Sequence, residues 1–250
     1  MKNLLAAFAA VCVMAGFAAS QTADEIMAKS LEARGGKDKI LALKSAKAFG
    51  KAFGGGMEIP MAFIWKRPGK IRFETIFGGK TGIQAYDGHS GWYIGMMGPG
   101  DAEKMPDESI KEMEENADWD GPLLDYKAKG HTVELIGSED IDGAPAFKLK
   151  VTLKSGDTKY IFIDAETWLE VKHISKTMQQ GAEIEVESYF SNYKTVDGVV
   201  MSFSLENKMG GQTVSQIGID SIKFNIDVND SLFAMPASKK ADSTKVTEKK

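Results

Sequence analysis

The first hydrophobic pattern of the chain has helical spacing. Thr22 precedes Glu25 by three residues, which is the capping-box pattern at a helix start. Apolar residues follow at positions 26, 27 and 31, and Gly35-Gly36 ends the run. We therefore expect a helix over residues 22–34 and a second, short helix over residues 38–43.

From residue 46 onward the apolar period falls to two, which is the period of a strand with one buried face. Apolar residues stand at positions 57, 59, 61, 63 and 65, up to the turn Arg67-Pro68-Gly69. Asp-Gly, Gly-Gly and Ser-Gly-Asp turns separate the later runs. Ten or eleven strands are expected from twelve such runs, at residues 57–65, 70–77, 81–86, 91–94, 132–136, 146–153, 159–163, 169–176, 183–186, 189–193, 199–208 and 212–225.

The strand pattern is interrupted near residue 95. Residues 96–106 are rich in Gly and Pro, and residues 107–117 have the spacing of an acidic helix with a thin apolar stripe. We interpret this helix as an insertion in one large antiparallel sheet, with Trp119, Leu123 and Leu124 completing its contact. A sheet of this size tends to curl or close on itself. The helices at 22–34 and 107–117 are then expected to cover one open side.

The two ends of the chain differ from this pattern. Lys2 and the apolar run over residues 4–19 are typical of a signal peptide, and we expect residues 1–20 to be removed between Ser20 and Gln21. A retained membrane anchor is the alternative, although the run is short for a spanning helix. A lipid-modified Cys12 is disfavoured because Cys12 lies inside the apolar run. Residues 21–236 are expected to form one domain, and the Lys-rich residues 237–250 a disordered tail.

Composition narrows the range of functions. Cys12 is the only cysteine, so removal of residues 1–20 leaves a chain without disulfides, thiol catalysis or Cys-based zinc sites. That chain carries 30 basic and 35 acidic residues and has no basic stripe with interleaved aromatic residues. We therefore expect no nucleic-acid partner. The sequence predicts export to an oxidising compartment and folding by burial of apolar surface alone.

Catalytic and metal-binding patterns are weak. His89, His131 and His173 are far apart and have no carboxylate at metal-ligand spacing, so we expect neither a metal site nor a cofactor. Acidic pairs such as Glu114-Glu115 lie in the acidic helix, where charges normally face water. A hydrolase would need two carboxylates facing each other across a cleft. We expect no enzymatic activity and keep an acidic-residue hydrolase as the least favoured alternative.

The hydrophobic residues are of an unusual kind. Residues 21–250 hold eleven methionines and the four tryptophans of the chain. Flexible, polarizable methionine suits a surface that accepts varied apolar shapes, and it suits a loosely specified core equally well.

Four motifs in a fixed order resemble a known family. The segment Phe63-Ile64-Trp65-Lys66-Arg67-Pro68-Gly69 is followed by Asp87-Gly88 and Trp92-Tyr93. Asp197-Gly198-Val199 comes next, and the closing segment, residues 225–236, reads Asn-Ile-Asp-Val-Asn-Asp-Ser-Leu-Phe-Ala-Met-Pro. Together these motifs resemble the periplasmic outer-membrane lipoprotein carriers of the LolA-like family. The resemblance covers nearly all of residues 21–236, but Gly35-Gly36, the long middle segment and the Lys-rich tail depart from the family pattern.

The resemblance implies a mainly β, α+β fold, namely a curved, incompletely closed antiparallel barrel with short helices as a lid. It also implies a carrier that shelters acyl chains of lipoproteins or a related lipid in an apolar concavity. A chain of about fifteen methylenes resists crossing water by on the order of 12 kcal/mol. The expected ligand-binding residues are Phe63, Trp65, Ile71, Phe73, Ile83, Trp92, Ile184 and Val186, and a one-residue error in register would reverse the face of any of them.

The family also implies a role for one arginine. The Arg of Lys-Arg-Pro, which is Arg67 in this sequence, is expected to tie the sheet to the lid, since a guanidinium has five donors. An exposed turn arginine is the alternative. The expected lid contacts are Arg67, Ile26, Leu31, Ile110 and Met113.

The implied partners are an acylated lipoprotein or lipid cargo, an inner-membrane releasing complex and an outer-membrane acceptor. A periplasmic sensing or interaction domain built on the same sheet is the main alternative to a carrier, because fold alone does not fix function.

Overall fold

The computed structural model describes residues 21–96, 100–179 and 182–237. The expected signal peptide, residues 1–20, and nearly all of the expected tail lie outside the described residues. No helix within the described ranges is long and apolar enough to cross a membrane.

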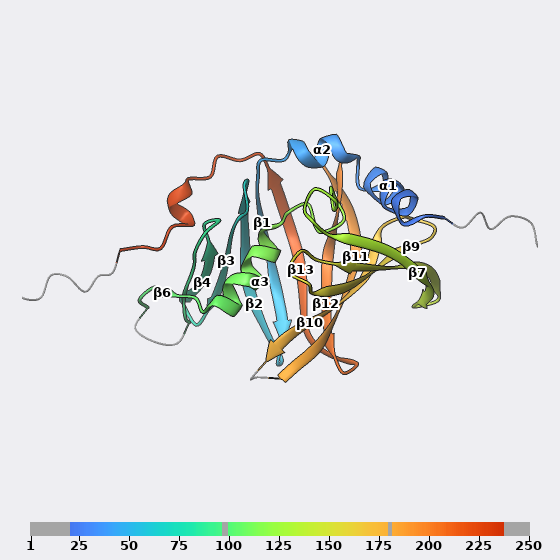
Figure 1. Ribbon diagram of the computed structural model, residues 1–250. Helices are drawn as coiled ribbons and strands as arrows, with labels where there is room; N and C mark the ends of the chain where they lie inside the picture. The colour runs from blue at the N-terminus through green and yellow to red at the C-terminus, as the bar shows by residue number, and fades with distance from the viewer. Residues whose placement is uncertain (1–20, 97–99, 180–181, 238–250) are drawn as a thin grey trace, which may run out of the picture.

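One antiparallel sheet of thirteen strands forms the molecule and does not close into a barrel (Figure 1). Its strand order is β6-β5-β4-β3-β2-β1-β13-β12-β11-β10-β9-β8-β7, so the first and second halves of the chain meet at the pair β1–β13. This confirms the expected mainly β fold with an open, curved sheet. The strands are β1 (Ser45–Gly54), β2 (Met57–Lys66), β3 (Lys70–Phe77), β4 (Lys80–Tyr86), β5 (Gly91–Ile94), β6 (Glu103–Lys104), β7 (Thr132–Ile141), β8 (Ala144–Thr152), β9 (Thr158–Asp164), β10 (Glu170–Gln179), β11 (Ala182–Val196), β12 (Val199–Met209) and β13 (Gln212–Phe224).

The strand count exceeds the ten or eleven expected, for local reasons. Residues 45–54 form β1, where repeated Ala and Gly weaken the alternation of large apolar and polar residues. Residues 182–196 form one strand, because Ser188, which interrupts the apolar pattern in the sequence, pairs with His173 and Asn207 in register with its neighbours. β7 runs five residues past its expected end, through an irregularity between Leu135 and Gly137.

Three helices accompany the sheet: α1 (Ala23–Ala33), α2 (Lys37–Ala42) and α3 (Asp107–Ala117). The expected capping box is present, since the Thr22 amide donates to Glu25 Oε2 at 2.8 Å and the Glu25 amide donates to Thr22 Oγ1 at 3.2 Å. α1 and α2 lie along one end of the sheet and α3 lies across the face turned to the viewer in Figure 1. All three expected helices therefore exist within one or two residues of their predicted bounds.

Gly35 lets the chain pass from α1 to α2 against the β11–β12 turn. Its φ is +107°, and a Cβ there would lie 2.2 Å from the carbonyl oxygen of Gly198. The adjacent backbone contact runs from the Val200 amide to the Arg34 carbonyl at 3.0 Å. Gly35, which only marked a helix end in the sequence, thus allows the end of α1 to approach the β11–β12 turn closely.

We expect Gly35→Ala to lower the free energy of unfolding by about 3 kcal/mol, because it adds backbone strain to a steric clash. Gly36→Ala is the matched control: Gly36 has φ +94°, but a Cβ at that position would meet no atom within 4 Å. It should cost only about 1 kcal/mol, the strain alone. Urea unfolding of both variants measures the difference, and equal losses would contradict the close approach to Gly198.

The sheet has two distinct faces. The inner face is the one covered by the helices, and its core includes Ala48, Phe63, Phe203 and Ile222 beneath Ile40 of α2. The opposite, outer face of β2–β5 is covered by residues 226–235, which we call the C-terminal strap. Ile226, Val228 and Phe233 of the strap pack on Ile64 of β2.

Candidate functional site

Four of the predicted ligand-binding residues share the inner face of β2 and β3. Phe63 pairs with Phe73, and Trp65 pairs with Ile71. Phe63 and Ile71 are 7% and 1% exposed, and they belong to the cores beneath α2 and α3. Trp119 lies edge-on to Trp65, with ring centroids 4.8 Å apart. These residues are on the expected face, but in this closed arrangement they are mainly covered by protein.

Two other predicted residues lie on the wrong face. Ile83 pairs with Glu74, and Trp92 pairs with Ala85, so both alternate with the inner-face rows. Trp92 is 2% exposed and its indole Nε1 donates to the Phe233 carbonyl of the strap at 2.7 Å. The sequence prediction that Ile83 and Trp92 line the concavity is wrong. Period-two alternation identifies the two faces of a strand but does not say which face a later segment will cover.

Ile184 and Val186 lie on the inner face, on the same side of β11 as Ser188, in a part of the sheet away from the helices. In the described residues, helices α1 and α3 contact mainly β7 and β3–β5. Half-buried apolar side chains on neighbouring strands continue this surface, which we call the open inner face. It consists of Ile59, Ile184, Val186, Phe190, Leu205 and Ile217.

Sequence reasoning misses four of these six residues. Phe190, Leu205 and Ile217 face one another across β11, β12 and β13, and Ile59 completes the row through Ala52. Leu205 and Ile217 each alternate with polar neighbours, so period two is a usable signal. Phe190 is missed because a division of residues 183–193 into two strands breaks the run Ile184-x-Val186-x-Ser188-x-Phe190.

Exposed apolar residues lie at the end of the sheet that is away from α1 and α2. Three consecutive hairpins of the sheet, β1–β2, β3–β4 and β12–β13, turn at this end through Gly-Gly pairs with positive φ. Two of these hairpins lie at the lower edge of Figure 1. The open inner face therefore continues into an apolar rim. Its exposed residues are Phe53, Met57, Ile76, Phe77 and Val214.

The predicted lid-contact residues all face the sheet. Ile26 is fully buried in the core formed with β8 and β9, and Leu31 packs against the core of the central strands. Met113 is buried and Ile110 packs beside it over β3–β5. Gly91 of β5 makes room for this contact, since a Cβ there would lie 3.3 Å from a side-chain carbon of Ile110. These positions are compatible with a lid, whose opening stays a prediction.

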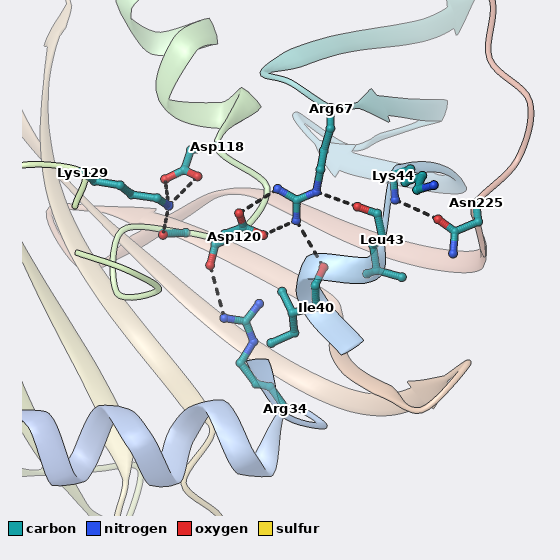
Figure 2. A network of polar contacts seen from close by, with 10 residues as sticks. Arg34, Ile40, Leu43, Lys44, Arg67, Asp118, Asp120, Lys129 and Asn225 are labelled. Carbon is teal, nitrogen blue, oxygen red and sulfur yellow. Dashed lines mark hydrogen bonds and ion pairs between the residues drawn. The ribbon is translucent and has the colours of Figure 1, made fainter. Parts of the chain in front are cut away.

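Arg67 joins the sheet to the segments that cover it (Figure 2). Its Nε donates to the Leu43 carbonyl at 2.6 Å, and one terminal nitrogen donates to the Ile40 carbonyl at 3.2 Å. The guanidinium also binds both carboxylate oxygens of Asp120, at 2.8 and 2.5 Å. These hydrogen bonds to Asp120 raise the pKa of Arg67 above its ordinary value. Arg67 thus donates to two carbonyls at the end of α2, and its role in holding a lid stays a prediction. Asp120 is a partner that the sequence did not indicate.

Further polar contacts extend this network, which we call the Arg67 network. Arg34, at the end of α1, donates to the Asp120 carbonyl at 3.5 Å. Lys129 donates to both carboxylate oxygens of Asp118 at 2.7 Å and to the Gly121 carbonyl (Figure 2). The loop after α3 is thus held between α1, α2 and the β2–β3 turn.

α3 also reaches the opposite part of the sheet. Lys111 pairs with Asp157 in the β8–β9 turn at 2.6 Å, and Glu115 pairs with Lys159 of β9 at 2.7 Å. α3 therefore connects the β3–β5 strands to β9 across the inner face. The exposed Lys111–Asp157 pair contributes at most about 1 kcal/mol.

Two cavities stand out, and neither coincides with the predicted ligand-binding set. One, of about 280 Å³, lies beside Arg67 and is lined by Leu43, Trp65, Glu114 and Trp119 among others. The other, of about 510 Å³, is lined largely by residues of β11–β13, such as Tyr189 and Glu206, and by Ile141 at the end of β7. Only Trp65 of the eight predicted residues lines either cavity.

The buried carboxylates of the described residues are bound to other groups and do not form the facing pair that the hydrolase alternative would need. The buried acids there are Asp120 and Asp164. Asp120 is bound to Arg67, and Asp164 accepts hydrogen bonds from the amides of Glu166 and Thr167 in its own turn. Across residues 21–96, 100–179 and 182–237, no group of three or more His, Cys, Asp or Glu side chains is placed to hold a metal ion.

Comparisons with known proteins agree with the fold. No family model and no curated protein matches the sequence. A LolA superfamily protein from Nitrosomonas europaea superimposes with a TM-score of 0.56 and 11% identity, over 86% of this chain and 98% of that one. A putative outer membrane lipoprotein-sorting protein domain from Vibrio parahaemolyticus gives 0.53 and 11%, over 83% and 94%.

A third structure extends the comparison. A DUF1329 family protein from Desulfovibrio piger gives a TM-score of 0.51 and 11% identity, over 84% of this chain and 96% of that one. At such low identity the likeness concerns the fold alone. The chain has the LolA-type fold, an open, curved antiparallel sheet with short helices on its inner face, as the resemblance in its sequence implied.

Proposed function

We propose that this protein is a periplasmic carrier that shelters the acyl chains of lipoproteins, or of a related lipid, and moves them toward the outer membrane. The observation that carries the proposal is the open inner face, a connected apolar surface away from the main helix contacts of the described chain, which α1 and α3 make with β7 and β3–β5. In a LolA-type fold this surface lies inside the curve of the sheet. The lipoprotein-sorting description of one structural neighbour supports the same class of cargo.

Physical chemistry favours a binding role for this surface. Each buried methylene contributes about 0.8 kcal/mol, so a surface of six large apolar side chains offers a substantial part of what an acyl chain loses by leaving water. Phe190, Leu205 and Ile217 lie side by side across three strands and form its centre. The proposed partners are an inner-membrane complex that releases the cargo and an outer-membrane acceptor.

The direct test is to purify the exported protein without detergent, extract it with organic solvent and identify any bound lipid or acylated protein by mass spectrometry. Acyl-chain cargo supports the carrier. A protein that carries none, and that also fails to bind a fluorescent fatty acid, would contradict it.

We expect Ile217→Asp to weaken binding of dansylundecanoic acid at least tenfold, because a carboxylate would have to be desolvated beside the acyl chain. Gln216→Asp is the matched control, since Gln216 is the neighbouring residue of β13 and faces outward. It should bind the probe like the unmodified protein. Titration of probe fluorescence measures both, and equal weakening by the two changes would remove the open inner face as the binding surface.

A further inference from the structure

One row of residues on the inner face is polar, although its neighbours are apolar. His173, Ser188, Asn207 and Ser215 pair directly across β10, β11, β12 and β13. The next row toward the helices is Phe190, Leu205 and Ile217, and Val186 lies on the other side of Ser188. Polar side chains in such a place reduce the apolar area available to an acyl chain, so their position requires an explanation.

Three of these polar residues form a hydrogen-bonded chain in which each donor points toward β13. The Ser188 hydroxyl donates to Asn207 Oδ1 at 2.7 Å, and Asn207 Nδ2 donates to Ser215 Oγ at 3.0 Å. Ser188 is 5% exposed, whereas Asn207 and Ser215 are only half-buried. The Ser215 oxygen therefore accepts from within the sheet. Among the described residues, no acceptor takes the proton of the Ser215 hydroxyl.

The charges around the row select a neutral ligand group. Lys172 and Lys208 point to the outer face, where both lie over the Tyr189 ring. On the inner face His173 contacts the Glu170 carboxylate at 3.1 Å through Nδ1. The two lysines that adjoin the row in β10 and β12, Lys172 and Lys208, therefore do not face the Ser188–Asn207–Ser215 chain and do not balance an anion there. The free hydroxyl hydrogen of Ser215 and the second amide hydrogen of Asn207 suit an uncharged acceptor.

We infer that this row binds the ester or amide carbonyl at the head of an acyl chain, while the methylenes lie on the open inner face. This inference rests on the proposed carrier function and names the part of the cargo that the protein recognises. Ser215 donates the terminal hydrogen bond, and Ser188 and Asn207 orient it. An alkyl chain without the carbonyl gains only the apolar contacts.

The test compares two ligands that differ by that carbonyl alone, 1-palmitoylglycerol and 1-O-hexadecylglycerol, each below its critical micelle concentration. Both are measured by displacement of dansylundecanoic acid from the full chain. The protein should bind the ester about fivefold more tightly than the ether, because this ratio of affinities corresponds to the net free energy of one hydrogen bond. Ser215→Ala should remove this preference and leave the affinity for the ether unchanged.

Ser221→Ala is the matched control, because Ser221 is an exposed residue of the same strand beyond an irregularity, where it pairs with Phe49 on the outer face. It should keep the fivefold preference, and thermal unfolding confirms that both variants are folded. Equal binding of the two ligands by the unmodified protein, or a preference that survives Ser215→Ala, would overturn the assignment of the row while leaving the carrier intact. Failure of both ligands to displace the probe would overturn the carrier function as well.

Discussion

Replacement of Arg67 by leucine is expected to lower the free energy of unfolding by about 3 kcal/mol. The change leaves Asp120, whose side chain is 9% exposed, as a buried carboxylate without its cation, and breaking one partner of such a pair typically costs about 3–5 kcal/mol. The lower end applies because the Arg67 side chain is about one-third exposed, at 32%, and water screens the pair. Urea unfolding measures the loss.

The double variant Arg67→Leu/Asp120→Leu separates the ion pair from the contacts to the lid. It removes the unpaired carboxylate, so it should be about 1–2 kcal/mol more stable than Arg67→Leu alone. The carbonyls of Ile40 and Leu43 still lose their donor in both variants. Amide hydrogen exchange over α1 and α2 should therefore be faster in both, and loading of the fatty-acid probe should change with it. An Arg67→Leu protein with unchanged exchange and unchanged loading would show that Arg67 is a structural residue and not a latch.

The sequence predicted elements well where local chemistry decides them. The Thr22–Glu25 capping box and the Gly35-Gly36 stop placed α1 within a residue, because each signal acts through its own backbone neighbours. β3 and β5 were predicted at their observed bounds, since tight turns delimit them. β1 was not delimited, because its alternating Ala and Gly give little contrast between faces.

The candidate site was less predictable, because it depends on what lies far away in the chain. Arg67 was singled out through its motif, yet Asp120 stands 53 positions later in a loop without any distinctive pattern. The residues of the open inner face come from β2 and from β11–β13, and β2 joins the other three strands only through the pairing of β1 with β13. Neither the sheet order nor the helix-free area follows from the period of one strand.

The outer face illustrates the same limit. Its strands carry large apolar residues such as Ile64 and Trp92 on the side opposite the helices, which is the pattern expected of a sheet lined on both faces. The strap supplies the second cover: Arg72 donates to the Leu232 carbonyl at 2.8 Å, and Lys66 and Lys70 hold the pKa of Asp230 down at about 2. The C-terminal strap, which resembled a family motif in the sequence, thus covers the outer face of β2–β5.

Trp92→Ala is accordingly expected to destabilise the protein by about 3–5 kcal/mol without affecting cargo binding in the folded state. The substitution leaves a large void beneath Phe233, which is fully buried, and removes the indole donor from the Phe233 carbonyl. Trp92→Phe keeps most of the volume and should cost about 1–2 kcal/mol, mainly for the unpaired carbonyl. Urea unfolding measures both losses.

Probe binding then distinguishes the two faces. At a temperature where Trp92→Phe is folded, it should bind dansylundecanoic acid as the unmodified protein does, because the sheet itself separates Trp92 from the open inner face. If a folded Trp92→Phe protein bound the probe tenfold more weakly, Trp92 would be part of the ligand-binding surface after all. Retained binding, together with weakened binding in Ile217→Asp, would place the cargo on the helix side of the sheet. The strap would then only stabilise the fold, because it covers the outer apolar face while the inner face is left for the cargo.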